Sequence, residues 1–98
     1  MISKEEFKNE VKIIAKKIGV NPKEVHLRKM KRKIASCSSK GRITFSIEIL
    51  KEIRQFRYHT IIHELLHLRY PNHSKMFNIM LKYYEKNMRK SLKASIES

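Results

Sequence analysis

The sequence predicts one α+β domain over residues 1–98, in the order N-terminal helix, small antiparallel sheet, helix and C-terminal helix. Two patterns indicate this order. Apolar residues recur at helical spacing in three segments, one near the N-terminus and two in the second half of the chain. Short segments in which apolar and polar residues alternate lie between the first and the second of them. No internal repeat or linker divides the chain, so we expect a single core.

The first helix is expected over residues 4–18. Ser3 and Glu6 form a capping box, in which each side chain satisfies a backbone amide of the first turn. Gly19 ends the segment because glycine readily takes the left-handed conformation that closes a helix. The apolar residues between these signals share one face: Phe7, Val11, Ile14, Ala15 and Ile18.

The sheet is expected from three extended runs that follow a short connector at residues 21–22. The first run begins with Val25 and Leu27, and the second covers residues 33–37. A polar turn at residues 38–41 joins the second run to the third as a hairpin. The third run places three apolar residues on one face: Ile43, Phe45 and Ile47.

Two helices are expected after the sheet. One covers residues 53–69 and the other residues 74–90, and residues 91–98 are expected to form a frayed tail. The last helix carries an apolar face formed by Phe77, Met80, Leu81, Tyr84 and Met88.

The first of these two helices carries His63, Glu64 and His67 as a His-Glu-x-x-His motif. A helix turns about 100° per residue, so the two histidines project from one face about 6 Å apart, a separation that suits tetrahedral zinc. Glu64 lies one residue round, where its carboxylate can reach a water at the metal and act as general base. Residues 61–68 are apolar almost all round, which predicts burial. Buried histidines need partners that offset their desolvation. A bound metal therefore explains these residues better than a position on the helix surface or at the edge of the core.

His73 is the expected third zinc ligand, provided that the helix ends before it. In a continuous helix, His73 would lie about 15 Å along the axis from His63. Pro71 supplies the break because it disfavours helical geometry at Tyr70 and lacks an amide hydrogen. Ser74 then caps a new helix, and the histidine lies in the corner between the two helices.

Three further side chains are alternatives around this site. Glu85 could replace His73 as the third ligand, and His59 continues the helical stripe of the motif, either as a ligand or as a polar residue at the rim. Cys37 is the only cysteine, so no intramolecular disulfide forms, and it is either a fourth ligand or a packed strand residue. All nine acidic residues are glutamates, so any carboxylate that orients a zinc-bound histidine must be a glutamate.

The 23 lysines and arginines and nine acidic residues give a formal net charge of +14. Five cations form a cluster that either contacts nucleic acid or belongs to a solvated strand face. These residues are Arg28, Lys29, Lys31, Arg32 and Lys33. No apolar stretch approaches the roughly 20 residues of a membrane span, and residues 1–6 are too acidic and polar for a signal peptide. We therefore expect a cytoplasmic protein without a membrane partner.

Two passages resemble the small zincin-like metalloproteases of the YgjP and SprT/Wss-like group. That group pairs a Gly-Ser-Cys-Ser strand motif with a His-Glu-x-x-His motif that is followed, after five residues, by another histidine. Residues 34–41 are similar to the first motif, and residues 63–74 contain the second. The likeness covers residues 30–84 and departs at Ile34 and Ala35, where the group usually carries Trp-Gly.

The resemblance implies a minimal zincin-like metallopeptidase domain that binds one zinc ion. Its ligands would be His63, His67 and His73. Glu64 would activate water for hydrolysis of a peptide bond. The substrate would be a polypeptide, lying along the exposed edge of the sheet. Separately from the resemblance, the small size of the domain allows a latent state, in which residues 91–98 of this chain or of a neighbouring molecule would occupy the cleft.

Two other classes of function stay open. A zinc-dependent hydrolase of nucleotide phosphoanhydrides could use residues 28–33 to hold phosphates. A basic nucleic-acid-binding module with a structural zinc would need a fourth ligand, from Cys37 or His59. The oligomeric state is open, and so is the choice of the side chain that stabilises the oxyanion. The candidates for that role are Tyr58, His59, Arg69, Tyr70 and Tyr83.

Overall fold

The computed structural model describes residues 1–38, 40–70 and 72–97. The turn expected at residues 38–41 and the break expected at Pro71 each include a residue outside these ranges. The elements follow the chain in the order α1 (Lys4–Ile18), β1 (Glu24–Arg28), β2 (Ala35–Cys37), β3 (Arg42–Ser46), the 3-10 helix η1 (Ile47–Lys51), α2 (Arg54–Leu66) and α3 (Lys75–Glu97).

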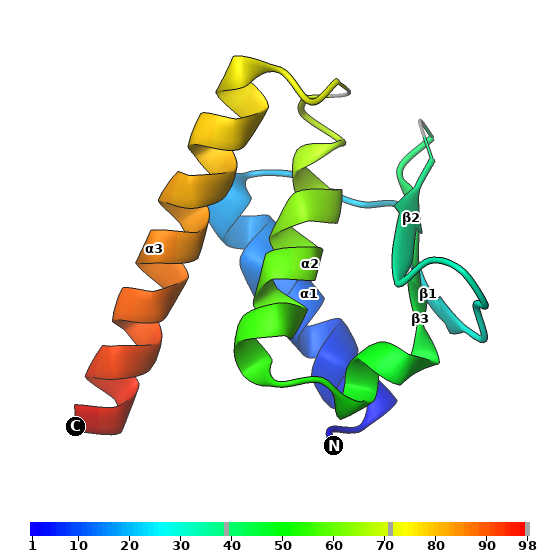
Figure 1. The fold of residues 1–98 in the computed structure, drawn as a ribbon, viewed down its shortest axis with the longest axis horizontal. Helices are drawn as coiled ribbons and strands as arrows, with labels where there is room; N and C mark the ends of the chain where they lie inside the picture. The colour runs from blue at the N-terminus through cyan, green and yellow to red at the C-terminus, as the bar shows by residue number, and fades with distance from the viewer. Residues whose placement is uncertain (39, 71, 98) are drawn as a thin grey trace.

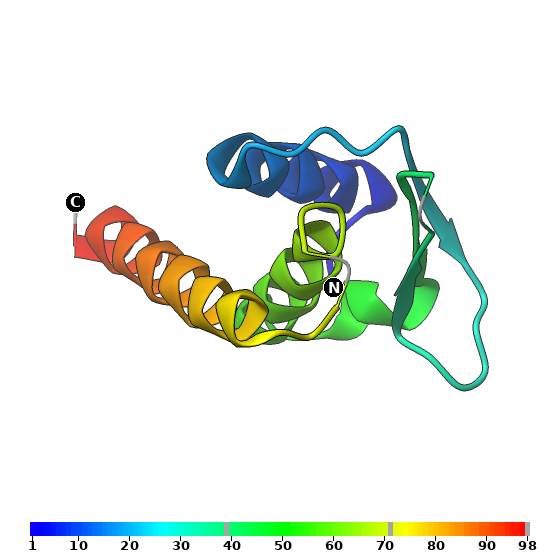
Figure 2. The same cartoon turned by 90° about the horizontal axis from the view of Figure 1, so that it is seen from above.

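The helix α2 lies at the centre of the molecule. Figures 1 and 2 show it between α3 on one side and the sheet on the other, with α1 packed across it. Most of the side chains buried between these layers are apolar, and they come from every helix and from β3. Two of them, Phe7 of α1 and Phe45 of β3, meet edge to face with ring centroids 4.9 Å apart. The α+β fold class is thereby confirmed.

The first helix has the bounds and both ends that its sequence predicts. The hydroxyl of Ser3 accepts a hydrogen bond from the amide of Glu6, with nitrogen and oxygen 3.1 Å apart. Gly19 has a φ of 83° and donates its amide to the carbonyl of Ala15. The five apolar residues of the expected face are all buried. This helix is set by local signals, and they agree with its packing.

The sheet is mixed, and the expectation of a wholly antiparallel sheet is wrong. Its strand order is β1-β3-β2, with β2 antiparallel and β1 parallel to β3. The chain reverses direction between β1 and β2 and again between β2 and β3, so β1 and β3 run the same way. Because β3 takes the middle position, it pairs with β1 in parallel. Local alternation cannot show which strand is central.

Ile47 was expected to continue the third strand, but it begins η1. The hydroxyl of Ser46 accepts a hydrogen bond from the amide of Glu48 at 3.3 Å and so caps this turn. Ser46 is buried, and the turn carries the chain from the end of β3 towards α2. A serine placed two residues before a glutamate was the signal for this turn in the sequence.

The last two helices differ from their expected bounds. Helix α2 covers Arg54–Leu66 instead of residues 53–69. Helix α3 continues to Glu97, so the expectation of a frayed tail over residues 91–97 is wrong. No glycine or proline interrupts this stretch, so nothing local ends the helix. Among the described residues, no helix is long and apolar enough to cross a membrane.

Candidate metal centre

The C-terminal end of α2 presents two histidines to the connection that leads to α3. His63 lies in the last turn of α2, and His67 is its C-cap with near-helical angles, φ −63° and ψ −24°. After His67 the chain makes tight turns, and the amide of Tyr70 donates to the carbonyl of Leu66 at 2.7 Å. The helix therefore ends just after it has placed both imidazoles on one face.

His73 returns to these two histidines from the start of α3. The hydroxyl of Ser74 accepts a hydrogen bond from the amide of Phe77, which confirms Ser74 as the cap of the new helix. The imidazole of His73 lies with its ring centroid 5.0 Å from that of His63 and 4.8 Å from that of His67. One potential ligand atom from each of the three histidines lies within 4.8 Å of the other two.

This donor set fits one tetrahedral metal ion. Imidazole nitrogens bind zinc at about 2.0–2.1 Å, which places two ligand nitrogens of a tetrahedron about 3.3 Å apart. The Nε2 atoms of His67 and His73 lie 3.1 Å apart. Burial lowers the pKa of His63, and its neighbours act in both directions to a smaller extent. A lowered pKa favours the neutral imidazole, which is the form that binds a metal.

Phe77 forms the floor beneath all three imidazoles. Its ring centroid lies 5.3 Å from that of His63, 4.9 Å from that of His67 and 4.6 Å from that of His73. The side chain is buried, with 1% of its surface exposed. The sequence places Phe77 on the apolar face of α3 but does not show this contact. Its position four residues after His73 was the available signal.

Glu64 faces a cleft between α2 and β2. It is 8% exposed, and its carboxylate oxygen Oε1 lies 3.3 Å from Nδ1 of His63. The cleft has a volume of about 470 Å³. It is lined by Lys33, Ala35, Ser36, Cys37, Ser38, Glu64 and His67. A substrate in this cleft would therefore lie against both the carboxylate and the histidine cluster.

Cys37 lines this cleft but does not join the histidine cluster. Burial, and to a smaller extent the charge of Glu64, raises the pKa of its thiol. The thiol also lies outside the described group of ligand atoms that are within 4.8 Å of one another. The arrangement thus favours the reading of Cys37 as a packed strand residue.

His59 and Glu85 contact each other on the outer side of this region. The ring centroid of His59 lies 6.3 Å from that of His63, one helical turn away. Neither residue belongs to the described group whose ligand atoms lie within 4.8 Å of one another. The structure thus places Glu85 against His59 and leaves the third position of the cluster to His73.

Several oxyanion candidates are engaged elsewhere. The guanidinium of Arg69 donates to the carbonyl of Ile18 at 3.0 Å and ties the end of α2 to the end of α1. Tyr83 lines a separate hollow between α1 and α3, and Tyr58 packs against the core. Tyr70 remains in the connection between His67 and His73, half-buried against the core.

Fold and site together have the architecture of a metallopeptidase: a three-histidine cluster and a buried glutamate beside an edge strand. A family model described as the YgjP-like metallopeptidase domain matches residues 2–95. The chain therefore belongs to the YgjP-like metallopeptidase family, whose activity requires a metal and whose substrates are polypeptides. This membership favours a peptidase over the phosphoanhydride hydrolase and the structural-zinc module.

A solved structure shares the fold. It is the metallopeptidase zymogen abylysin of Pyrococcus abyssi, which superposes with a TM-score of 0.63 at 24% sequence identity. The match covers 95% of this chain and 94% of that chain. At this identity the likeness shows the architecture alone. A search of the curated proteins found no match.

Proposed function

We propose that this chain is a zinc-dependent metallopeptidase that hydrolyses peptide bonds with a water activated by Glu64. The observation that carries the proposal is the grouping of three histidine nitrogens within 4.8 Å of one another, next to Glu64. We assign His63, His67 and His73 as the ligands. Three protein ligands leave a fourth position open, which distinguishes catalytic from structural zinc sites.

Each residue has a defined task in this reaction. When bound, zinc supplies a Lewis acid that polarises the scissile carbonyl and acidifies water. Glu64 accepts a proton from the attacking water, whose oxygen forms the new bond to the carbonyl carbon. As the carbon–nitrogen bond breaks, Glu64 returns that proton to the leaving amine. Its low exposure keeps bulk water away from the carboxylate.

The edge of β2 is the proposed binding site for the substrate backbone. Strand β2 pairs only with β3 among the described strands, so its other edge is free to pair with an extended peptide. The cleft that contains Glu64 is lined by β2 itself. A peptide added to this edge would pass directly over the histidine cluster.

The basic cluster supports a narrower form of the proposal, in which the substrates are proteins bound to nucleic acid. All five of its residues are exposed. Arg28 ends β1, the other four lie between β1 and β2, and Lys33 also lines the cleft. Phosphate contacts from such residues would give binding that weakens steeply as salt rises. Cleavage would then be stimulated by nucleic acid at low salt.

The test measures bound metal and cleavage of an unstructured protein for wild type and Glu64→Gln. Glu64→Gln keeps the ligands, so it should hold one equivalent of zinc while its kcat falls about a thousandfold. Glu85→Gln is the matched control, because it removes a glutamate that contacts a histidine outside the cluster. It should keep both zinc and activity. Equal activity of wild type and Glu64→Gln would overturn the proposal.

The same assay with single-stranded DNA tests the narrower form. Stimulation of wild type, and its loss when the five cluster residues are changed to glutamine, would support an action on nucleic-acid-bound proteins. Cleavage that does not respond to DNA at any salt concentration would restrict the proposal to general peptidase activity.

A further inference from the structure

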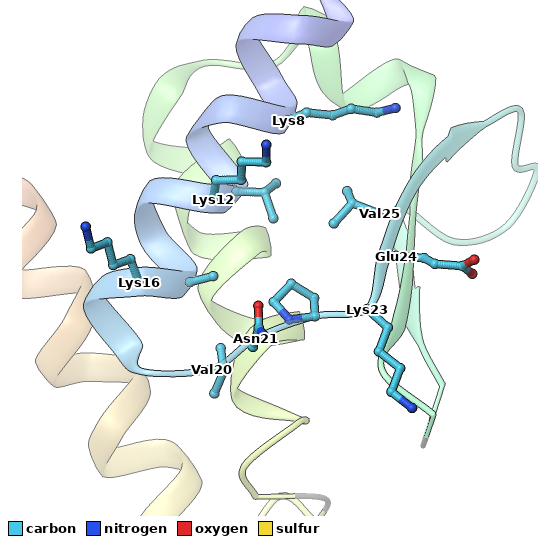
Figure 3. Close-up of a pocket in the computed structure, with 11 residues that line it drawn as sticks. Lys8, Lys12, Lys16, Val20, Asn21, Lys23, Glu24 and Val25 are labelled. Atoms are coloured by element: carbon cyan, nitrogen blue, oxygen red, sulfur yellow. The ribbon is translucent and has the colours of Figure 1, made fainter.

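A groove lies between α1 and β1, at the edge of the sheet opposite to β2, which lines the cleft. Its volume is about 370 Å³ (Figure 3). The residues that line it are Lys8, Val11, Lys12, Ala15, Lys16, Val20, Asn21, Pro22, Lys23, Glu24 and Val25. We call it the lysine groove. Neither the histidine cluster nor the basic cluster of residues 28–33 contributes to it.

One wall of the lysine groove is a row of positive charge on α1. Lys8, Lys12 and Lys16 follow one another at intervals of four residues, so they share a face of the helix at steps of about 6 Å. All three are exposed, and none has an ion-pair partner among the described residues. The amine of Lys8 extends across towards β1 (Figure 3).

The only acidic residue of the lining does not neutralise these lysines. The carboxylate of Glu24 points out of the groove (Figure 3). On the outer face of β1 it accepts a hydrogen bond from Nε of Arg42 at 2.5 Å, and it lies 3.3 Å from the ring of His26. The amines of Lys8 and Lys12 therefore face the groove without a counter-charge from its lining, whereas the amines of Lys16 and Lys23 point away from it (Figure 3).

The floor of the lysine groove is apolar and aliphatic. Val11 and Ala15 of α1 are buried beneath it, and the side chain of Val25 points towards α1 from β1 (Figure 3). No aromatic residue lines it. Single-stranded nucleic acids bind by stacking their bases on aromatic side chains as well as by charge. An aliphatic floor between lysines instead fits a polypeptide in which aliphatic residues alternate with carboxylates.

A second hollow adjoins this groove and extends towards the end of α2. Its volume is about 510 Å³, and it shares Val20, Asn21 and Lys23 with the lysine groove. From there it continues to Leu68 and Arg69, which directly follow the cluster residue His67. Its lining adds the positive charges of Lys40 and Arg69. The two hollows thus lie next to each other between α1 and the residues that follow α2.

We propose that the lysine groove binds an acidic, aliphatic stretch of the polypeptide substrate, remote from the scissile bond, so that the chain prefers acidic polypeptides. This inference rests on the proposed peptidase function, because it names the substrate class of that site. The groove would act on binding and therefore on KM, whereas Glu64 acts on kcat.

The test separates binding from cleavage. The probe is a fluorescent peptide built from Glu-Val-Glu-Ala repeats, and its counterpart replaces every glutamate with glutamine. Fluorescence anisotropy measures their affinity for full-length Glu64→Gln protein, and for the same protein with Lys8, Lys12 and Lys16 changed to glutamine. Glutamine is a good helix former, so circular dichroism should show α1 intact. The acidic peptide should lose about tenfold in affinity, as expected for three screened ion pairs.

The matched control changes Lys75, Lys82 and Lys86 to glutamine. These residues are exposed on α3, so the control removes the same charge from another surface. It should change the affinity for the acidic peptide less than twofold. An equal loss in both triple variants, or equal binding of the glutamine peptide, would overturn the inference. Tighter binding of a single-stranded oligonucleotide that is lost in the α1 variant would assign the groove to nucleic acid and overturn it too.

Cleavage by the zinc-loaded protein distinguishes the two proposals. Suppose that the wild type cuts a neutral unstructured protein, and that the α1 variant cuts the acidic and the neutral peptide with the same KM as the wild type. The inference then fails, and the peptidase function stands. If the acidic peptide binds through α1 but no polypeptide is cut, the peptidase function fails, and with it the role of the groove in substrate selection. The expected result is an about tenfold higher KM for the acidic peptide at constant kcat.

Discussion

Helix α2 carries buried polar groups in both of its halves, and these groups differ in the number of hydrogen-bond partners that the protein gives them. Near its N-terminus, the guanidinium of Arg57 donates to both carboxylate oxygens of Glu10 at 3.0 Å and to the carbonyl of Glu52 at 2.8 Å. Near its C-terminus, the carboxylate of Glu64 has one side-chain hydrogen-bond partner among the described residues, the ring of His63 at 3.3 Å. Both glutamates are largely buried.

The difference separates a structural site from the proposed functional one. Arg57 joins α1, the turn after η1 and α2, and the hydrogen bond with Glu10 raises the pKa of its guanidinium. Each of its three guanidinium nitrogens donates a hydrogen bond to a protein oxygen. Among the described residues, the three histidines and Glu64 make side-chain hydrogen bonds only with one another, between His63 and Glu64 and between His67 and His73. Burial alone is therefore a poor guide, whereas the number of protein partners discriminates.

The largest predicted effect is on stability, through Arg57→Met. Methionine fills a similar volume but leaves the carboxylate of Glu10 without its partner in a site where it is 18% exposed. We expect the free energy of unfolding to fall by about 3 kcal/mol. Urea denaturation followed by circular dichroism measures this. Glu64→Gln is the control, and should change the same quantity by less than about 1 kcal/mol. Equal losses in the two variants would erase the distinction between the two halves of α2.

The next effect is on metal affinity, through His73→Ala. Loss of a residue that only hydrogen-bonds to a metal ligand weakens metal binding by up to about a hundredfold. Removing one of the three proposed ligands themselves should therefore weaken zinc binding by at least about a hundredfold. His73 is exposed, so the free energy of unfolding without metal should not change. Competition with a chromophoric chelator measures the affinity. His26→Ala removes an exposed histidine of β1 and should have no effect; unchanged affinity in His73→Ala would instead point to another third ligand.

The smallest effect concerns the ion pair of Arg42 and Glu24, an exposed counterpart of the buried pair. The hydrogen bond from Arg42 is the largest cause that lowers the pKa of Glu24 below its ordinary value of 4.5. A lowered pKa stabilises the fold above pH 4.5, and this contribution is lost as the pH falls through the folded-state pKa.

Arg42→Gln should therefore lower the melting temperature slightly at neutral pH, and the difference from wild type should disappear in acid. Differential scanning fluorimetry of both proteins, from neutral pH into the acid range, measures this difference in melting temperature. A loss as large as that of Arg57→Met would show that burial does not set the strength of these pairs.

Local signals predicted the parts of the molecule that depend on neighbours in the sequence. Ser3 and Gly19 bounded α1, and the structure confirms both ends. The spacing of His63 and His67 placed two imidazoles on one face, and the need to end the helix before His73 predicted a corner between two helices. The structure brings the three together. Their roles in binding a metal remain predictions.

Long-range contacts decided what the sequence could not show. The carboxylate of Glu10 binds Arg57, which lies 47 residues further along the chain, and no local sequence pattern predicts this pair. The floor beneath the imidazoles, the central place of β3 and the lysine groove likewise need two or three elements to meet.

By itself, then, the sequence determined which residues can carry the chemistry, because ligand spacing on a helix follows from helical geometry. It also determined α1, because its caps and apolar face lie within one segment. Only the tertiary structure decided that β1 pairs with β3 in parallel and which polar groups of α2 find protein partners. The physical reason is that strand order and buried ion pairs are set by contacts between distant segments, which compete for the same interior.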